Sequence, residues 1–217
     1  MKAYAEYFVE KGIAYRRNTI LQFGESWDLI GNVVLANPGS AVPLSEISTE
    51  SFNRVTNFYR SFRSSNELNF DNWFEFSVDP TMLFIKKIFG GDYVERRREL
   101  NGVIQLFNTF NIKNQNLQEA VKQIGFESDL LFSYGIEKYF HNKPTYFGFS
   151  NQVLNNPDLR KVAIQIFKNA STDVRKIYRN EFSENSFYHP MYVNRAYNQS
   201  HFQPYKQSIL LPLVENS

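Results

Sequence analysis

Polar residues that can bind a ligand recur at the ends of the apolar runs of this sequence. They are Asn37-Pro38-Gly39-Ser40, Asn108-Thr109, Tyr134-Gly135 and a late His189-Pro190. An asparagine amide offers one acceptor and two donors, and a histidine imidazole can donate or accept a hydrogen bond. Several of these residues also favour tight turns, so what they can do depends on the elements that position them.

Four short apolar or aromatic runs predict β-strands. The runs are nearly continuous rather than alternating, which is typical of strands covered on both faces. Turn-forming residues bound them, and Ile20 to Phe23 is predicted as an additional edge strand. The four runs span residues 33–36, 103–107, 130–134 and 145–149.

Apolar residues at three-four spacing predict helices between these strands, over 52–62, 80–89, 116–124, 158–167 and 172–182. Alternating strands and helices favour a three-layer α/β/α fold with a central, largely parallel sheet of four to five strands. No repeat or low-complexity linker divides the chain, so we expect a single domain over 1–217. Ligands bind at the carboxyl ends of strands in such sheets, where the polar groups lie.

Composition narrows the classes of function. The 217 residues include no cysteine, which excludes disulfides, thiolate metal sites and cysteine nucleophiles. The three histidines show no metal-ligand spacing, and we expect no metal and no cofactor. A net charge of +2 is too small for the molecule as a whole to attract nucleic acid electrostatically. Because we find no signal-peptide pattern and no run near the roughly 20 apolar residues that span a bilayer, we expect a cytoplasmic protein without a membrane partner.

The polar groups resemble motifs of the uracil-DNA glycosylases. Asn37 to Ala41 resembles the motif G-I-N-P-G of the mismatch-specific branch. Residues 102–109 resemble the strand G-V-L-L-L-N-T of the classical branch, and residues 130–135 resemble the following strand, which ends in L-W-G. His189-Pro190 is similar to the last motif, H-P-S-P.

A closer resemblance is to a family of uncharacterised bacterial domains (domain of unknown function 1643). Its members read N-P-S-T-A, D-P-T, N-L-F, W-G and H-P-L-Y in that order. The resemblance implies a uracil-DNA glycosylase-like fold with a helical insertion at about 152–186, because glycosylases run almost directly from the last strand into H-P. The corresponding residues here are Asn37 to Ala41, Asp79-Pro80-Thr81, Leu106-Phe107-Asn108, Tyr134-Gly135 and His189-Pro190-Met191-Tyr192.

The resemblance also implies roles in hydrolysing an N-glycosidic bond of a nucleotide or nucleic acid. Asn37 orients water through its side-chain carbonyl, and His189 donates a hydrogen bond to the leaving base; these are the catalytic residues. Asn108 reads the pyrimidine edge, and Gly39 and Ser40 present backbone N–H groups to a phosphate if they begin a helix. Whether the chain is an enzyme stays open, because asparagine does not titrate near neutral pH. The substrate-binding residues are Pro38, Gly39, Ser40, Asn108, Tyr134 and Gly135.

Other interpretations of the same residues stay open. The chain could be a catalytically silent module that binds a nucleotide or nucleic acid, or an interaction protein that uses the helical insertion. Asn37-Pro38-Gly39 suits any strand-to-helix turn, and Asn108 and His189 can each bond only to backbone. Asp79-Pro80 is explained by an N-cap residue followed by proline at the first helical position.

Residues 52–63 interleave aromatic rings with arginines, a mixture that binds single-stranded nucleic acid. An amphipathic helix with a solvated basic face explains the same pattern.

Overall fold

Seven strands form one mixed sheet in this computed structural model, which describes residues 1–63, 68–124 and 131–217. The strand order is β4-β5-β1-β2-β6-β3-β7. β3 runs parallel to β6 and β7, whereas the other neighbours are antiparallel. The prediction of a largely parallel sheet of four to five strands, as in a uracil-DNA glycosylase-like fold, is therefore wrong. The strands are β1 (Lys2–Glu10), β2 (Ile13–Phe23), β3 (Leu29–Leu35), β4 (Pro43–Glu46), β5 (Trp73–Phe76), β6 (Gly102–Asn108) and β7 (Thr145–Phe147).

An N-terminal hairpin accounts for most of this difference. β1 and β2 pair through a two-residue turn, Lys11-Gly12, in which both residues have positive φ, 52° and 80°. Such turns match the twist of antiparallel strands. Ile20 to Phe23 is not an edge strand, because β2 lies inside the sheet between β1 and β6. β1 is not a continuous apolar run, because its buried and exposed residues include two glutamates, and a search for such runs therefore misses it.

Three of the four predicted main strands are confirmed as β3, β6 and β7. In the fourth, 130–134, Leu130 lies outside the described residues. The described remainder is not a strand, since Phe132 makes only an isolated antiparallel bridge to Phe110. Gly135 then turns the chain with a φ of 73° into a 3-10 turn, so the extended run ends there.

The predicted helices are present, with one shortened. The helix predicted over 172–182 ends at Arg175, because a 3-10 turn over Lys176–Tyr178 follows and Arg179 and Asn180 have positive φ. None of the described helices is long and apolar enough to cross a membrane. The helices are α1 (Thr49–Arg63), α2 (Pro80–Phe89), α3 (Leu117–Lys122), α4 (Asn151–Asn155), α5 (Pro157–Asn169), α6 (Thr172–Arg175), α7 (Pro190–Ala196), α8 (Gln203–Tyr205) and α9 (Leu211–Glu215).

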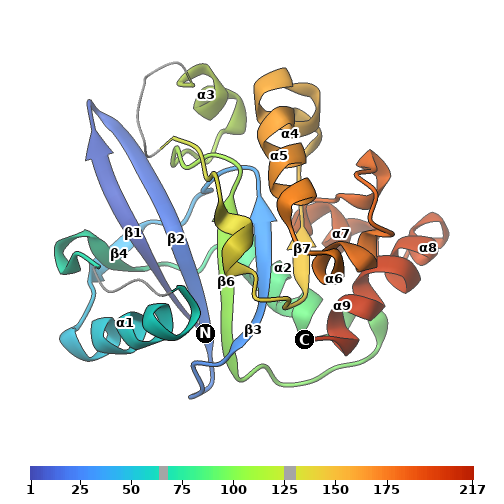
Figure 1. Cartoon of the computed structure of the whole chain (residues 1–217), viewed down its shortest axis with the longest axis horizontal. Helices are drawn as coiled ribbons and strands as arrows, with labels where there is room; N and C mark the ends of the chain where they lie inside the picture. Colours follow the sequence, from blue (N-terminus) through green and yellow to red (C-terminus); the bar gives the residue numbers. More distant parts are fainter. Residues whose placement is uncertain (64–67, 125–130) are drawn as a thin grey trace.

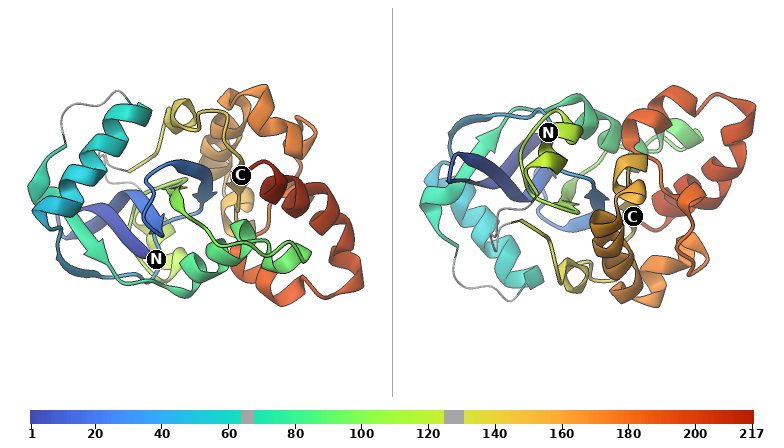
Figure 2. Two further views of the ribbon diagram at one scale, coloured as in Figure 1. Left: turned by 90° about the horizontal axis from the view of Figure 1, so that it is seen from below. Right: turned by 90° about the horizontal axis from the view of Figure 1, so that it is seen from above.

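Helices cover both faces of the sheet because successive strand residues point to opposite sides. Tyr4 and Ile20 pack in one cluster with α1, whereas their neighbours Ala3 and Leu21 belong to the cluster that contains α2. The helices from α4 onward lie at the β7 end of the molecule, and α1 lies at the opposite end (Figures 1 and 2). The carboxyl ends of β3 and β6 line one cavity together with the starts of α2 and α7.

Candidate functional site

A cavity of about 210 Å3 lies at the carboxyl ends of β3 and β6. We name it the Asn37–His189 pocket. Its polar lining includes the side chains of Arg16, Asn37, Asp79, Asn108 and His189, together with those of Ser40, Thr81, Gln115 and Ser150. The structure thus brings together Asn37, Asn108 and His189, which are far apart in sequence. Gly39 and Ser40 also line it. The roles predicted for these residues stay predictions, and their geometry defines what each can do.

Asn37 follows β3 and fastens the loop that it begins. Its Nδ2 donates to the backbone carbonyls of Pro38 (3.1 Å), Ile112 (3.3 Å) and Asn114 (2.9 Å). The amide therefore has a structural role, and its Oδ1 is the atom that it can offer to a ligand or water. No helix begins after Asn37, since the next element in the described chain is β4, so the predicted helix-start N–H groups of Gly39 and Ser40 do not form.

Asn108 is the last residue of β6 and is only 1% exposed. Among the described residues, neither Nδ2 nor Oδ1 of its side chain has a hydrogen-bond partner. A buried polar group without a partner costs about 1–3 kcal/mol, so such groups are uncommon. The capping role considered for Asn108 is not observed in the described part of the chain. Asn108 lines the pocket, and its amide carries a donor and an acceptor without a partner in the described chain.

His189 is the N-cap residue of α7. Its Nδ1 accepts a hydrogen bond from the backbone N–H of Met191 at 3.3 Å, which assigns the neutral tautomer with the proton on Nε2. Burial lowers the pKa of His189 below its ordinary 6.5, and the charge of Asp79 opposes this shift. At neutral pH the imidazole is therefore an uncharged donor.

Asp79 is both the N-cap residue of α2 and a wall residue of the pocket. Its Oδ1 accepts from the N–H of Met82 at 2.9 Å at the start of α2, with Pro80 at the first helical position, so the capping interpretation is confirmed. The same carboxylate also lines the pocket. Burial lowers the pKa of both Arg16 and His189, and the charge of Asp79 partly offsets this lowering.

Arg16 is the charged wall residue that sequence reasoning missed. It lies in β2, is 2% exposed, and burial lowers its pKa to about 10, so it remains a cation at neutral pH. The available signal was the pair Arg16-Arg17. Adjacent residues of a strand point to opposite faces, so two arginines in a strand covered on both faces cannot both face solvent. That signal required recognising β2 over its full length.

The remaining predicted residues lie elsewhere. Tyr134 is exposed and lines a second cavity of about 340 Å3, to which Asn108 also contributes. Gly135 is the left-handed residue before a 3-10 turn, Ile136–Tyr139. Pro38 contributes its backbone carbonyl to the loop contacts of Asn37. In the described structure, none of these three lines the Asn37–His189 pocket.

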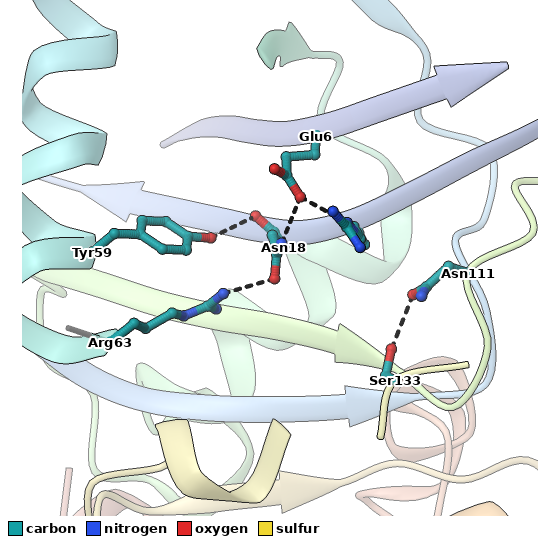
Figure 3. Close-up of polar contacts among 7 residues, drawn as sticks. Glu6, Asn18, Tyr59, Arg63, Asn111 and Ser133 are labelled. Atoms are coloured by element: carbon teal, nitrogen blue, oxygen red, sulfur yellow. Dashed lines mark hydrogen bonds and ion pairs between the residues drawn. The ribbon is translucent and has the colours of Figure 1, made fainter. Parts of the chain in front are cut away.

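The second cavity has a polar wall whose groups bond to one another (Figure 3). Arg63 of α1 donates to Gln105 Oε1 at 2.9 and 2.6 Å and to Asn18 Oδ1 at 2.7 Å. Glu6 accepts from Arg17 at 2.8 Å and from Asn18 at 2.6 Å. Figure 3 shows Arg63 and Tyr59 pointing from α1 toward Asn18.

The same contacts show how residues 52–63 pack. The rings of Phe58 and Tyr59 are buried, and Arg63 is held by side chains of the sheet, whereas Arg54 and Arg60 are exposed. An amphipathic helix packed on the sheet is therefore observed, and binding of nucleic acid by its exposed face stays a prediction.

Comparison with known protein families, curated proteins and solved structures gives no match for this chain. The resemblance to glycosylases and to the bacterial domain family therefore stays a prediction. The described residues contain no group of three or more histidine, aspartate or glutamate side chains that could hold a metal ion.

Proposed function

We propose that the Asn37–His189 pocket binds the edge of a nucleobase, or of a similar cyclic amide, belonging to a nucleotide or nucleic acid. The observation that carries this proposal is the buried amide of Asn108, whose donor and acceptor both lack partners among the described residues. A side-chain amide forms paired hydrogen bonds with a planar edge that offers an acceptor beside a donor. A ligand of this kind supplies both missing bonds at once.

The size of the pocket supports the same class of ligand. Its volume of about 210 Å3 is below the roughly 300–1,000 Å3 of pockets that enclose a whole drug-sized molecule. A single ring fits such a space, with the remainder of the ligand outside. His189 adds a neutral Nε2–H donor, and Asn37 adds an oxygen acceptor.

Calorimetric titration with uracil and uridine tests the proposal. The unmodified chain should bind at least one of them, and Asn108→Leu should abolish binding because leucine has a similar size but no hydrogen-bonding atoms. Asn57→Leu, on the exposed side of α1, is the matched control and should leave affinity unchanged. Absence of binding by the unmodified chain, or equal binding by Asn108→Leu, would refute base recognition.

A second candidate function is hydrolysis of an N-glycosidic bond in the same pocket. In this reaction water adds to the sugar carbon as the carbon–nitrogen bond breaks, and the bonding electron pair leaves with the base. The observation that favours it is the tautomer of His189, whose Nε2–H can donate to the developing negative charge on the base. Oδ1 of Asn37 can orient the water, whose proton passes to solvent or to the departing base.

Release of free uracil from deoxyuridine and from uracil-containing single-stranded DNA distinguishes the two candidates. Hydrolysis predicts release that is lost in Asn37→Ala and in His189→Ala. Binding of uridine without any release would support recognition alone and reject hydrolysis.

A further inference from the structure

The guanidinium of Arg16 is a buried cation at the wall of the Asn37–His189 pocket. Among the described residues, its Nε and Nη1 have no hydrogen-bond partner, and no ion pair joins it to Asp79. The ring of Phe76, 5.3 Å from the guanidinium carbon, is its packing partner. An aromatic face attracts the positive charge, but it does not accept hydrogen bonds from the N–H groups that point outward in the plane of the guanidinium.

The other arginines of this sheet region differ from Arg16. Arg17, the next residue of β2, lies on the opposite side, where it forms an ion pair with Glu6 at 2.8 Å. Arg63 donates to Gln105 and Asn18. Both have acceptors for their guanidinium groups within the described chain. Arg16 is thus the buried arginine that the described fold leaves with unsatisfied donors.

A second cation lies within electrostatic reach of Arg16. Lys113 is half-buried, and its pKa is lowered first by burial and then by the positive charge of Arg16. Asp79 is the opposing charge in the pocket, but its Oδ1 is engaged with the N–H of Met82. The local balance of these groups is two cations to one carboxylate, since His189 is neutral.

A buried charge without partners is costly, and folded proteins retain one chiefly where something else satisfies it. The planar fork of arginine fits the two oxygens of a carboxylate or phosphate, and hydrogen bonds between ionised partners are about twice as strong as neutral ones. The two bidentate faces of the fork are Nε with Nη2 and Nη1 with Nη2. Each contains one of the donors that the described chain leaves free, so an oxyanion at the guanidinium would use one of them.

We propose that Arg16 is an anion-binding residue and that the ligand of the Asn37–His189 pocket carries an oxyanion, a carboxylate or a phosphate, beside its cyclic amide. The amide part of this inference rests on the proposed function. The anionic part rests on Arg16 alone, so the two can be tested separately.

Two pairs of probes compare an anion with its neutral counterpart by calorimetry at pH 7. Orotate and uracil differ by a ring carboxylate, and uridine 5′-monophosphate and uridine differ by a phosphate. We expect the anionic member of one pair to bind at least tenfold more tightly than its neutral partner. The pair that shows the preference identifies the source of the oxyanion.

Variants assign this preference to Arg16. Arg16→Met keeps the length and packing of the side chain without its charge, and should reduce the preference to about onefold. Arg17→Met is the matched control, because the neighbouring residue faces the second cavity, and it should retain the preference. Thermal unfolding of Arg16→Met at or above the temperature of the unmodified chain establishes that the fold is intact.

Equal binding of anion and neutral partner in both pairs would overturn the anionic inference, as would a preference that survives in Arg16→Met. In either case, uracil binding that is lost in Asn108→Leu would still support base recognition. Failure of all four probes to bind would overturn both proposals.

Discussion

Replacing Asn108 by leucine should stabilise the folded chain. The amide is almost completely buried at the end of β6, and neither of its polar atoms has a partner among the described residues. A buried unsatisfied group costs about 1–3 kcal/mol. Leucine removes both groups with little change in volume. We expect the free energy of unfolding to rise by about 1–3 kcal/mol.

Urea unfolding, followed by far-ultraviolet circular dichroism, measures this change. The slope of the free energy against urea should stay constant, because the surface exposed on unfolding is nearly the same. In a chain of this size, an increase of 1 kcal/mol corresponds to a melting temperature higher by about 2–4 °C.

Asn32→Leu is the matched control, since Asn32 lies on the neighbouring strand β3 and is equally buried. Its Nδ2 donates to the carbonyl of Phe140 at 3.0 Å, and its Oδ1 accepts from Gln105 at 2.9 Å. The same substitution there leaves these buried partners without hydrogen bonds and should lower the free energy of unfolding by about 2 kcal/mol or more. Destabilisation of Asn108→Leu by a similar amount would refute the reasoning, because the amide of Asn108 would then be paired within the fold.

Three further predictions concern charged groups of the two cavities. The free energy of unfolding of Arg16→Met should be unchanged or higher, because the substitution removes a buried cation without partners. That of Arg63→Met should fall by about 3 kcal/mol, because Gln105 and Asn18 lose their donor. Urea unfolding compares the two variants, and a large decrease in Arg16→Met would contradict an unsatisfied guanidinium. The lowered pKa of His189 means that the unfolded chain binds more protons between that pKa and 6.5, so stability should fall as the pH drops through this window. His189→Asn, which keeps an N-cap residue, should show a shallower fall between pH 7 and 5, and an identical profile would refute the assignment. Asp79→Ala should lower the free energy of unfolding by about 1 kcal/mol and Asp79→Asn by less, because asparagine also caps helices; equal losses would show that charge, not capping, is what Asp79 contributes.

Local patterns in the sequence determine several elements and the positions of the candidate residues within them. The apolar runs that became β3, β6 and β7 are bounded by turn residues, and the helices α1, α2 and α5 follow three-four spacing. The cap of α2 by Asp79 is a local effect as well, since it joins residues three positions apart. Asn37, Asn108 and His189 could therefore be placed at the ends of elements, and their meeting in one pocket could be predicted.

Tertiary structure alone decided the direction of most strand pairs and the charge of the pocket. A strand pattern does not specify which strand will be its neighbour, because pairing is chosen among segments distant in sequence. The insertion of β2 between β1 and β6 carries Arg16 into the pocket, and no local feature of Tyr15-Arg16-Arg17 states which arginine faces which side. Whether a buried amide such as Asn32 finds partners, or like Asn108 finds none in the described chain, depends on side chains brought from other strands and loops.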